Sequence, residues 1–445
     1  MKNIIKSFQQ LVIVVSVTIG FAASAQQKSM QYFRPNDKNG LNIFENTKND
    51  TTPFNGMKVK VGGNFTQDFQ GLRHQNDATP VYVNNINKNQ LAAINTGFNR
   101  AWANLNVDAQ LEDGVRMNLT MYLYTRHEMP FWVKGGYLQL DKMPFLKSKT
   151  IDDIMKDFTI KAGDYEIDYG DQHFRRSDAG NAIYNPFIEN YIMDEVSVEI
   201  GGEIYFHPKC GIIIMAGVSN PEANPIVLSP SQIDTATGML NKSTPAYHGK
   251  VGYDKQFTKD FRFRITGSIY VDQSATDNQL FSGDVAGSRY YFVMENTTAT
   301  DAGNAYSGRY DPQFTEQVTT FMINPFIKFQ GLELFGTYEM AKGRLITEPD
   351  MRTATQYAVD LIYRFPRNKE NFWIGGRYNT VMAALPLVQN DITINRVVGS
   401  LGWFVTKNIM LKTEYVNQQY LHFASTDIRS NGRFDGFMIE GSIAF

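Results

Sequence analysis

Strict alternation of apolar and polar residues around a tight turn constrains the fold of this chain more than any other feature. Asp113-Gly114 is a strong hairpin-turn signal, and each flanking arm has about the 9 to 11 residues that a tilted membrane-crossing strand needs. A helical period would mix Asn106 and Asp108 with the apolar residues, so it fits poorly. The segment predicts two antiparallel strands with one apolar face, formed by Ala103, Leu105, Val107, Ala109 and Leu111 before the turn and by Val115, Met117, Leu119, Met121 and Leu123 after it.

The same hairpin rhythm recurs along the chain. Further arms lie at 57–69, 131–140, 158–169, 196–219, 247–271, 315–343, 354–381, 391–420 and 437–445. They bring the count to about sixteen strands, an even number that places both ends of the barrel on one side of the membrane. The strand-like run at 289–295 is assigned to a loop, because counting it would break this parity. The pattern predicts an all-β fold, a transmembrane antiparallel β-barrel of about 16 strands.

The connections between these strands alternate in length. Short turns, such as 113–114, 258–260 and 406–408, alternate with long polar loops near 70–96, 170–194, 220–245, 273–314, 382–390 and 421–433. Short periplasmic turns and long outer loops are typical of transmembrane barrels. A helical turn is expected in the longer periplasmic connection at 147–156. Aromatic residues bracket the short turns and predict a girdle at the lipid–water boundary, made of Phe257, Phe261, Phe365, Phe372, Trp373, Trp403 and Phe404.

The N-terminal residues have the three parts of an export signal. Lys2 and Lys6 precede an apolar run from Leu11 to Phe21, and Ala23-Ser24-Ala25 follows as a small-x-small cleavage pattern. We therefore predict a cleaved signal peptide over 1–25, a short periplasmic N-terminal segment over 26–55 and an outer-membrane barrel over 56–445. The segment 26–52 is too short and polar to predict a plug domain.

Composition excludes several classes of partner and chemistry. Removing Lys2 and Lys6 from the 43 basic residues leaves 41 against 45 acidic ones, so no basic field favours nucleic acid. Cys210 is the single cysteine, which excludes a disulfide framework. The carboxylates at 164, 168 and 171 lack calcium-loop spacing, and no histidines are paired at metal spacing. We predict no metal, no cofactor and no enzyme activity, since lumen polarity explains His248 and Ser268 more simply than a catalytic pair does.

The last strand carries a family resemblance. Its apolar residues alternate up to the terminal aromatic: Phe437, Ile439, Gly441, Ile443 and Phe445. This resembles the assembly signal of Gram-negative outer-membrane proteins, and the whole chain resembles sixteen-stranded porins. The resemblance implies a location in outer-membrane lipid, recognition by the barrel-assembly machinery and a homotrimer, although no subunit face is evident in the strands.

A barrel of this size leaves an aqueous channel unless something fills it. The predicted inward residues are polar and of both signs: Arg116, Glu199, Glu203, Lys250, Arg262 and Arg264. In general porins the loop after the fifth strand narrows the lumen, and by resemblance of position the loop at 170–194 is expected to do the same. Its charges would face Arg262 and Arg264 across the channel, whereas the alternative is a solvated outer loop whose charges pair with each other. The residues assigned to the constriction are Asp168, Asp171, Arg175, Arg176, Asp178 and Glu189.

The leading functional interpretation is a porin-like channel for passive diffusion of small hydrophilic solutes. The alternative is a non-conducting barrel that binds a partner protein in a secretion or surface complex, with the loop at 273–314, including Tyr290, Tyr291 and Phe292, as its docking surface. A transporter of hydrophobic substrates would need an apolar inner pocket, and the predicted inward set is polar.

Overall fold

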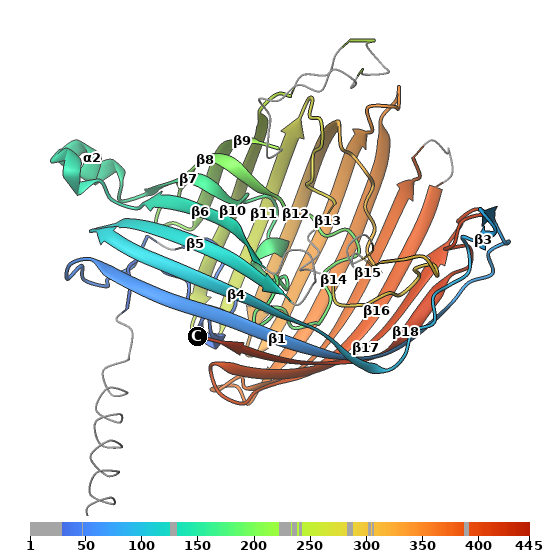
Figure 1. The fold of residues 1–445 in the computed structure, drawn as a ribbon. Helices are drawn as coiled ribbons and strands as arrows, with labels where there is room; N and C mark the ends of the chain where they lie inside the picture. Colours follow the sequence, from blue (N-terminus) through green and yellow to red (C-terminus); the bar gives the residue numbers. More distant parts are fainter. Residues whose placement is uncertain are drawn as a thin grey trace, which may run out of the picture.

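The computed structural model describes residues 29–46, 48–124, 131–221, 233, 238–239, 243–282, 288–300, 304, 307–386 and 391–445. The predicted signal peptide at 1–25 lies outside these residues. Sixteen antiparallel strands of the described chain close into one barrel (Figure 1). Their bounds are β1 (Lys58–Gln75), β4 (Gly97–Glu112), β5 (Val115–Tyr124), β6 (Phe131–Leu140), β7 (Phe158–Glu166), β8 (Val198–Phe206), β9 (Ile212–Asn220), β10 (Ala246–Thr258), β11 (Phe261–Asp272), β12 (Gln317–Phe329), β13 (Leu332–Arg344), β14 (Arg352–Phe365), β15 (Phe372–Ala384), β16 (Asp391–Phe404), β17 (Ile409–Leu421) and β18 (Arg433–Ala444).

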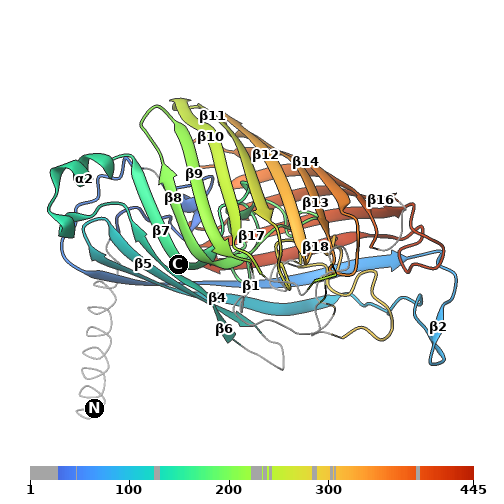
Figure 2. The ribbon, with the colours of Figure 1, turned by 90° about the horizontal axis from the view of Figure 1, so that it is seen from above.

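Neighbours in sequence pair around the barrel, and β1 closes it by pairing with β4 on one side and β18 on the other. The predicted all-β barrel is confirmed, and 289–295 lies in a loop. A short helix, α2 (Lys149–Ile154), lies in the expected periplasmic connection, and a small hairpin, β2 (Tyr82–Val83) and β3 (Ile86–Asn87), projects from an outer loop. Figures 1 and 2 show α2 and this hairpin at opposite ends of the barrel. Within the described residues, no helix is long and apolar enough to cross a membrane.

The alternation of side chains gives the wall two chemically different faces. Apolar residues such as Ile200, Leu361 and Val397 are exposed on the outside, while polar neighbours such as Glu199 and Asp360 are buried inside. Successive strand residues point to opposite faces, which is the reason for this separation. An apolar outer belt around a closed hydrogen-bonded barrel is the form in which strands cross a membrane.

Aromatic residues at the periplasmic end form the predicted girdle, with one correction. Phe365, Phe372 and Trp403 stack outside the barrel with ring centroids 5.8 Å apart at each contact. Trp373 and Phe404 are each 1 % exposed and point into the lumen instead. Each directly follows an outward aromatic residue, so the two-residue period of the strand turns it inward.

Candidate functional site

The inner loop, residues 167–197 between β7 and β8, crosses the lumen and packs against the opposite wall. Its apolar residues Phe187, Ile188, Ile192 and Met193 are fully buried. Because a buried loop has no water for its backbone, those groups need partners from the wall. Polar side chains of β14 to β17 supply many of them, and the bonds run from Lys412 to the oxygen of Phe187 (2.6 Å), from Arg377 to that of Glu189 (3.0 Å), from Arg396 to that of Asn190 (2.7 Å), and from the nitrogens of Ile192 and Met193 to Asn379 (2.7 Å) and Gln356 (2.9 Å).

Two of the predicted constriction carboxylates, Asp168 and Asp171, lie against the wall at β10 and β11. Asp171 accepts hydrogen bonds from Arg264 at 2.7 and 2.8 Å, from Thr266 at 2.8 Å and from Lys250 at 3.1 Å. Lys250 also pairs with Asp168. Asp171 therefore touches Arg264 directly, whereas these charges were expected on opposite sides of an open channel. The difference arises because the inner loop turns inward at the end of β7, beside β10 and β11.

This arrangement also bears on metal binding. The ammonium group of Lys250 occupies the position between Asp168 and Asp171 that a cation would take. Within the described residues, no group of three or more histidine, cysteine, aspartate or glutamate side chains has the geometry to hold a metal ion.

The two arginines of the inner loop have different partners. Arg176 donates to both carboxylate oxygens of Asp194, at 2.8 and 3.2 Å, and to Asp178 at 2.9 Å. Arg175 lies 3.7 Å from Glu333 on β13. Burial raises the pKa of Asp194, but the guanidinium groups beside it more than offset this effect and lower that pKa to about 2. Asp194 is consequently ionised at neutral pH and fixes Arg176 inside the loop.

Glu189 connects the inner loop to the outer loop at 273–314. Its carboxylate accepts hydrogen bonds from the backbone nitrogens of Arg289 (2.6 Å) and Tyr290 (3.2 Å). Tyr290 is fully buried, and its ring packs on Phe434 at 5.3 Å. Tyr290 is therefore not part of an exposed surface on which a partner protein could dock, contrary to the alternative expected from the sequence.

The remaining predicted wall residues face the lumen, and each has a neighbour on the barrel. The pairs are Arg262 with Asp254 (2.5 Å), Glu203 with His248 (3.0 Å), Glu199 with Ser219 (2.5 Å), and Arg116 with Asp108 (3.2 Å). The hydrogen bond between His248 and Glu203 accounts for this histidine as part of the polar lumen wall.

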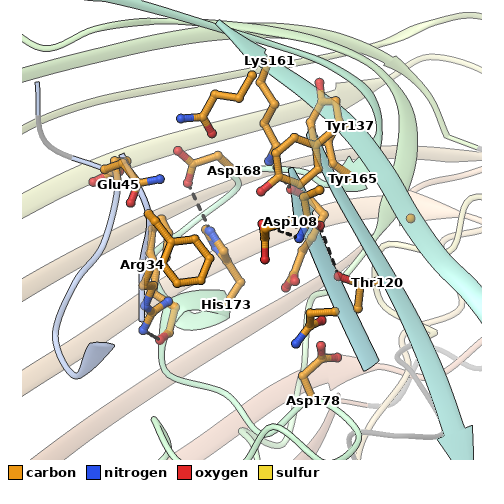
Figure 3. A pocket seen from close by; sticks show the side chains of 18 of the residues that line it. Arg34, Glu45, Asp108, Thr120, Tyr137, Lys161, Tyr165, Asp168, His173 and Asp178 are labelled. Atoms are coloured by element: carbon orange, nitrogen blue, oxygen red, sulfur yellow. Dashed lines mark hydrogen bonds and ion pairs between the residues drawn. The ribbon is translucent and has the colours of Figure 1, made fainter. Parts of the chain in front are cut away.

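A cavity of about 310 Å³ remains between the inner loop, the N-terminal segment at 33–46 and the wall formed by β4 to β8. Figure 3 shows its side chains converging from these three parts of the chain. Lys161 lies over the rings of Tyr137 and Tyr165, at 4.7 and 4.1 Å from their centroids. The other residues around the space include Arg34, Glu45, Asp108, Thr120 and Asp178.

The chemistry of this cavity suits water and hydrophilic solutes. Cationic and anionic side chains both line it, and in the described chain the buried atoms Asn36 Nδ2, Tyr165 Oη and Glu166 Oε1 have no protein hydrogen-bond partner. Polar atoms left in this way are costly unless water or a solute satisfies them. The cavity therefore offers both donors and acceptors to whatever occupies it.

Sequence reasoning missed two groups of residues. Arg377, Arg396 and Lys412 follow the inward alternation of their strands and were detectable from that signal. The contribution of the N-terminal segment, including Arg34 and Glu45, had no detectable signal, because the segment has no period and its partners on the wall and the inner loop are distant in sequence.

No protein-family model matches the sequence, and no curated protein matches it either. Solved structures with a similar fold include an anion-selective porin from Comamonas acidovorans, which is 9 % identical with a TM-score of 0.51; the match covers 87 % of this chain and 100 % of the porin. The outer membrane channel DcaP of Acinetobacter baumannii is 9 % identical with a TM-score of 0.51, covering 88 % of this chain and 98 % of DcaP. OprB of Pseudomonas putida has the same identity and TM-score, covering 88 % of this chain and 94 % of OprB. At this identity the likeness is one of fold, and together with the apolar belt it identifies an outer-membrane β-barrel with the porin fold.

Proposed function

We propose that this protein is a porin-like channel through which small hydrophilic solutes diffuse passively across the outer membrane. The observation that carries the proposal is the polar cavity between the inner loop and β4 to β8, which has charges of both signs and unsatisfied donors and acceptors. A solute that replaces water there keeps its hydrogen bonds, whereas an apolar solute leaves the lining atoms unpaired. The inner loop acts as the constriction by filling the other side of the lumen.

The rival function, a non-conducting barrel that binds a partner protein, has less support. Its proposed docking loop turns Tyr290 into the lumen, and Tyr291 and Phe292 are half-buried. The homotrimer implied by the resemblance to porins stays a prediction, as does the absence of enzyme activity.

The test is to fill the cavity from the wall. Thr120 lines the cavity from β5, and its neighbour Leu119 points to the outer face of the same strand. Thr120→Trp is expected to lower single-channel conductance in a planar bilayer and to slow sugar-driven swelling of proteoliposomes, because the indole occupies the proposed path. Leu119→Trp is the matched control and is expected to leave both unchanged.

Three results would contradict the proposal. Absence of conductance in a correctly folded wild-type barrel would exclude the diffusion channel. Unchanged conductance in Thr120→Trp would move the path away from this cavity. Equal losses in Thr120→Trp and Leu119→Trp would show that filling the cavity has no effect of its own on conductance.

A further inference from the structure

The N-terminal segment forms a ring inside the periplasmic mouth of the barrel. We call the described residues 31–46 and 48–52 the collar. Its two ends meet, because Gln31 Nε2 donates to the carbonyl oxygen of Thr52 at 2.8 Å and the backbone nitrogen of Tyr32 donates to Asp50 at 2.5 Å. A segment with joined ends that packs on its surroundings is a compact loop rather than a loose tail.

The collar contacts the wall around most of the circumference. Moving along it, the partners lie in turn beside β4, β16 and β17, β13, β11, β10, and β6 with β7. The contacts are Gln31 to Gln110 (3.2 Å), Lys38 to Lys407 (2.9 Å), Asn42 to Glu333 (2.6 Å) and to Arg262 (2.7 Å), Glu45 to Arg264 (2.6 Å) and to Lys250 (3.4 Å), and Lys48 to the carbonyl oxygens of Asp141 (2.8 Å) and Phe158 (2.7 Å).

Two adjacent residues fix the middle of the collar to the wall and to the inner loop. Phe44 is 2 % exposed and packs in an apolar cluster with Tyr191 of the inner loop and with Phe326 and Phe335 of the wall. Glu45 binds Arg264 with both oxygens, at 2.6 and 2.8 Å. Burial opposes ionisation of Glu45, but Arg264 and Lys250 outweigh it and hold its pKa well below the usual range. The collar is thus held by both apolar and ionic contacts.

The collar also borders the proposed solute path. Arg34, Phe44 and Glu45 all line the cavity that separates the inner loop from β4 to β8. Around Glu45, the cations Lys250, Arg262 and Arg264 are connected by ion pairs to the carboxylates of Glu45, Asp168, Asp171 and Asp254. Three cations thus face four carboxyl groups. Burial raises the pKa of Asp168 to about 7, so the cluster is close to neutral at pH 7 and would become positive without the charge of Glu45.

We propose that the collar is a second constriction, at the periplasmic mouth, and that Glu45 determines charge selectivity there. This inference rests on the proposed channel function. Two parts of the chain then narrow the channel and limit its conductance. These are the inner loop, near the middle of the lumen, and the collar, on the periplasmic side of the inner loop. A narrow passage lined by fixed charge selects ions by sign, so the negative charge of Glu45 offsets the cations around it and shifts the passage toward cations.

The first experiment removes the collar from the full-length protein. Because its ends already touch, residues 33–49 are replaced by a short Gly-Ser linker that keeps Gln31 and Thr52 in place. Single-channel conductance is expected to rise several-fold over the wild type. The heat-dependent shift in gel mobility that folded barrels show is the control for folding.

The outcomes separate the two proposals. Equal conductance in both proteins overturns the collar and leaves the channel function standing. A silent wild type with a conducting variant supports the collar and overturns passive diffusion. Two folded but silent proteins overturn the collar as the limiting element.

The second experiment keeps the collar and changes its charge, so that it does not depend on the folding of the deletion variant. Glu45→Gln is expected to lower the ratio of potassium to chloride permeability several-fold, as measured from reversal potentials in a KCl gradient. Glu112→Gln removes an exposed carboxylate at the same mouth, and it is expected to leave the ratio unchanged. An unchanged ratio in Glu45→Gln, or equal shifts in the two variants, overturns the role of Glu45.

Discussion

At the scale of single residues, a shift of one position decides between lipid and lumen. Phe372 stacks in the outer girdle, while the next residue, Trp373, donates its indole N–H to the carbonyl oxygen of Pro186 at 3.0 Å inside the barrel. A strand allows no intermediate orientation, because successive side chains alternate between its faces. The same rule brings the inward charged residues within reach of the inner loop, where individual ion pairs such as Arg176 with Asp194 fix its path.

Replacing Asp194 by Asn is expected to destabilise the protein in a pH-dependent way. The pKa of Asp194 is about 2 in the folded protein against 3.8 ordinarily, so its ionic contribution is fully present above about pH 4 and is lost as pH falls toward 2. The linked free energy is about 2 kcal/mol at neutral pH. Unfolding of wild type and Asp194→Asn in detergent micelles, compared from pH 7 to pH 2, measures this difference.

The matched control is Asp153→Asn. Asp153 forms an exposed ion pair with Lys156 on the periplasmic connection, and such pairs contribute little. A difference for Asp194→Asn that stays constant between pH 4 and pH 2 would contradict the assigned ionisation.

At the scale of elements, the inner loop has no regular structure along most of its length and depends on the wall for its hydrogen bonds. Arg396 is the clearest case, because its guanidinium donates to the carbonyl oxygen of Asn190 in the inner loop (2.7 Å), to that of Gly308 in the outer loop (2.6 Å) and to the side chain of Gln418 (2.5 Å). One residue of β16 therefore holds two loops against the same wall. Such tethers keep a constriction at a fixed size.

Replacing Arg396 by Met is expected to loosen both loops without opening the barrel. The carbonyl oxygen of Asn190 loses this donor, and an unsatisfied buried group costs about 1 to 3 kcal/mol. The expected result is a several-fold rise in open-channel current noise with the barrel still folded. Arg73→Met, which removes a largely exposed arginine paired with Asp435, is the control; noise at the wild-type level in Arg396→Met would show that the tether is dispensable.

At the scale of the whole molecule, closure of the barrel depends on pairing between its first strand, β1, and its last strand, β18. β1 pairs with β18 over the span from Asn64 with Ala444 to Gln75 with Arg433. The terminal residue completes the seam, because the backbone nitrogen of Phe445 donates to Gly63 at 3.0 Å and that of Gly63 donates back at 3.1 Å. No strand edge is left at this seam, which removes a common route to aggregation.

Deleting Phe445 is expected to reduce assembly in cells much more than stability in vitro. The seam loses only its last backbone pair, whereas the resemblance to the outer-membrane assembly signal depends on the terminal aromatic. The measurement compares the amount of folded protein in outer-membrane fractions with the refolding yield in detergent. Phe372→Ala removes an aromatic from the same mouth and is the control, and equal losses in the cell and in detergent would assign Phe445 a purely structural role.

The sequence by itself determined the barrel. Alternation with a period of two, turn residues and the apolar terminal strand are local signals, and they predicted most strands to within a few residues because each strand carries its own pattern. The first strand is the exception, since β1 continues to Gln75, six residues beyond the predicted arm at 57–69. The same signals also predicted which polar wall residues face inward. Trp373 and Phe404 were misassigned because the girdle was predicted from the clustering of aromatic residues near the turns, and not from the face of the strand on which each residue lies.

Only the tertiary structure decided what fills the lumen. The inner loop and the collar have no periodicity, and their positions depend on contacts such as Glu45 with Arg264 and Ile188 with Glu414, which are more than two hundred residues apart in sequence. The direct pairing of Asp171 with Arg264 likewise depends on where the loop enters. The charge and polarity of these residues show that they need partners when buried. Which groups lie close enough to pair with them depends on the geometry of the closed barrel.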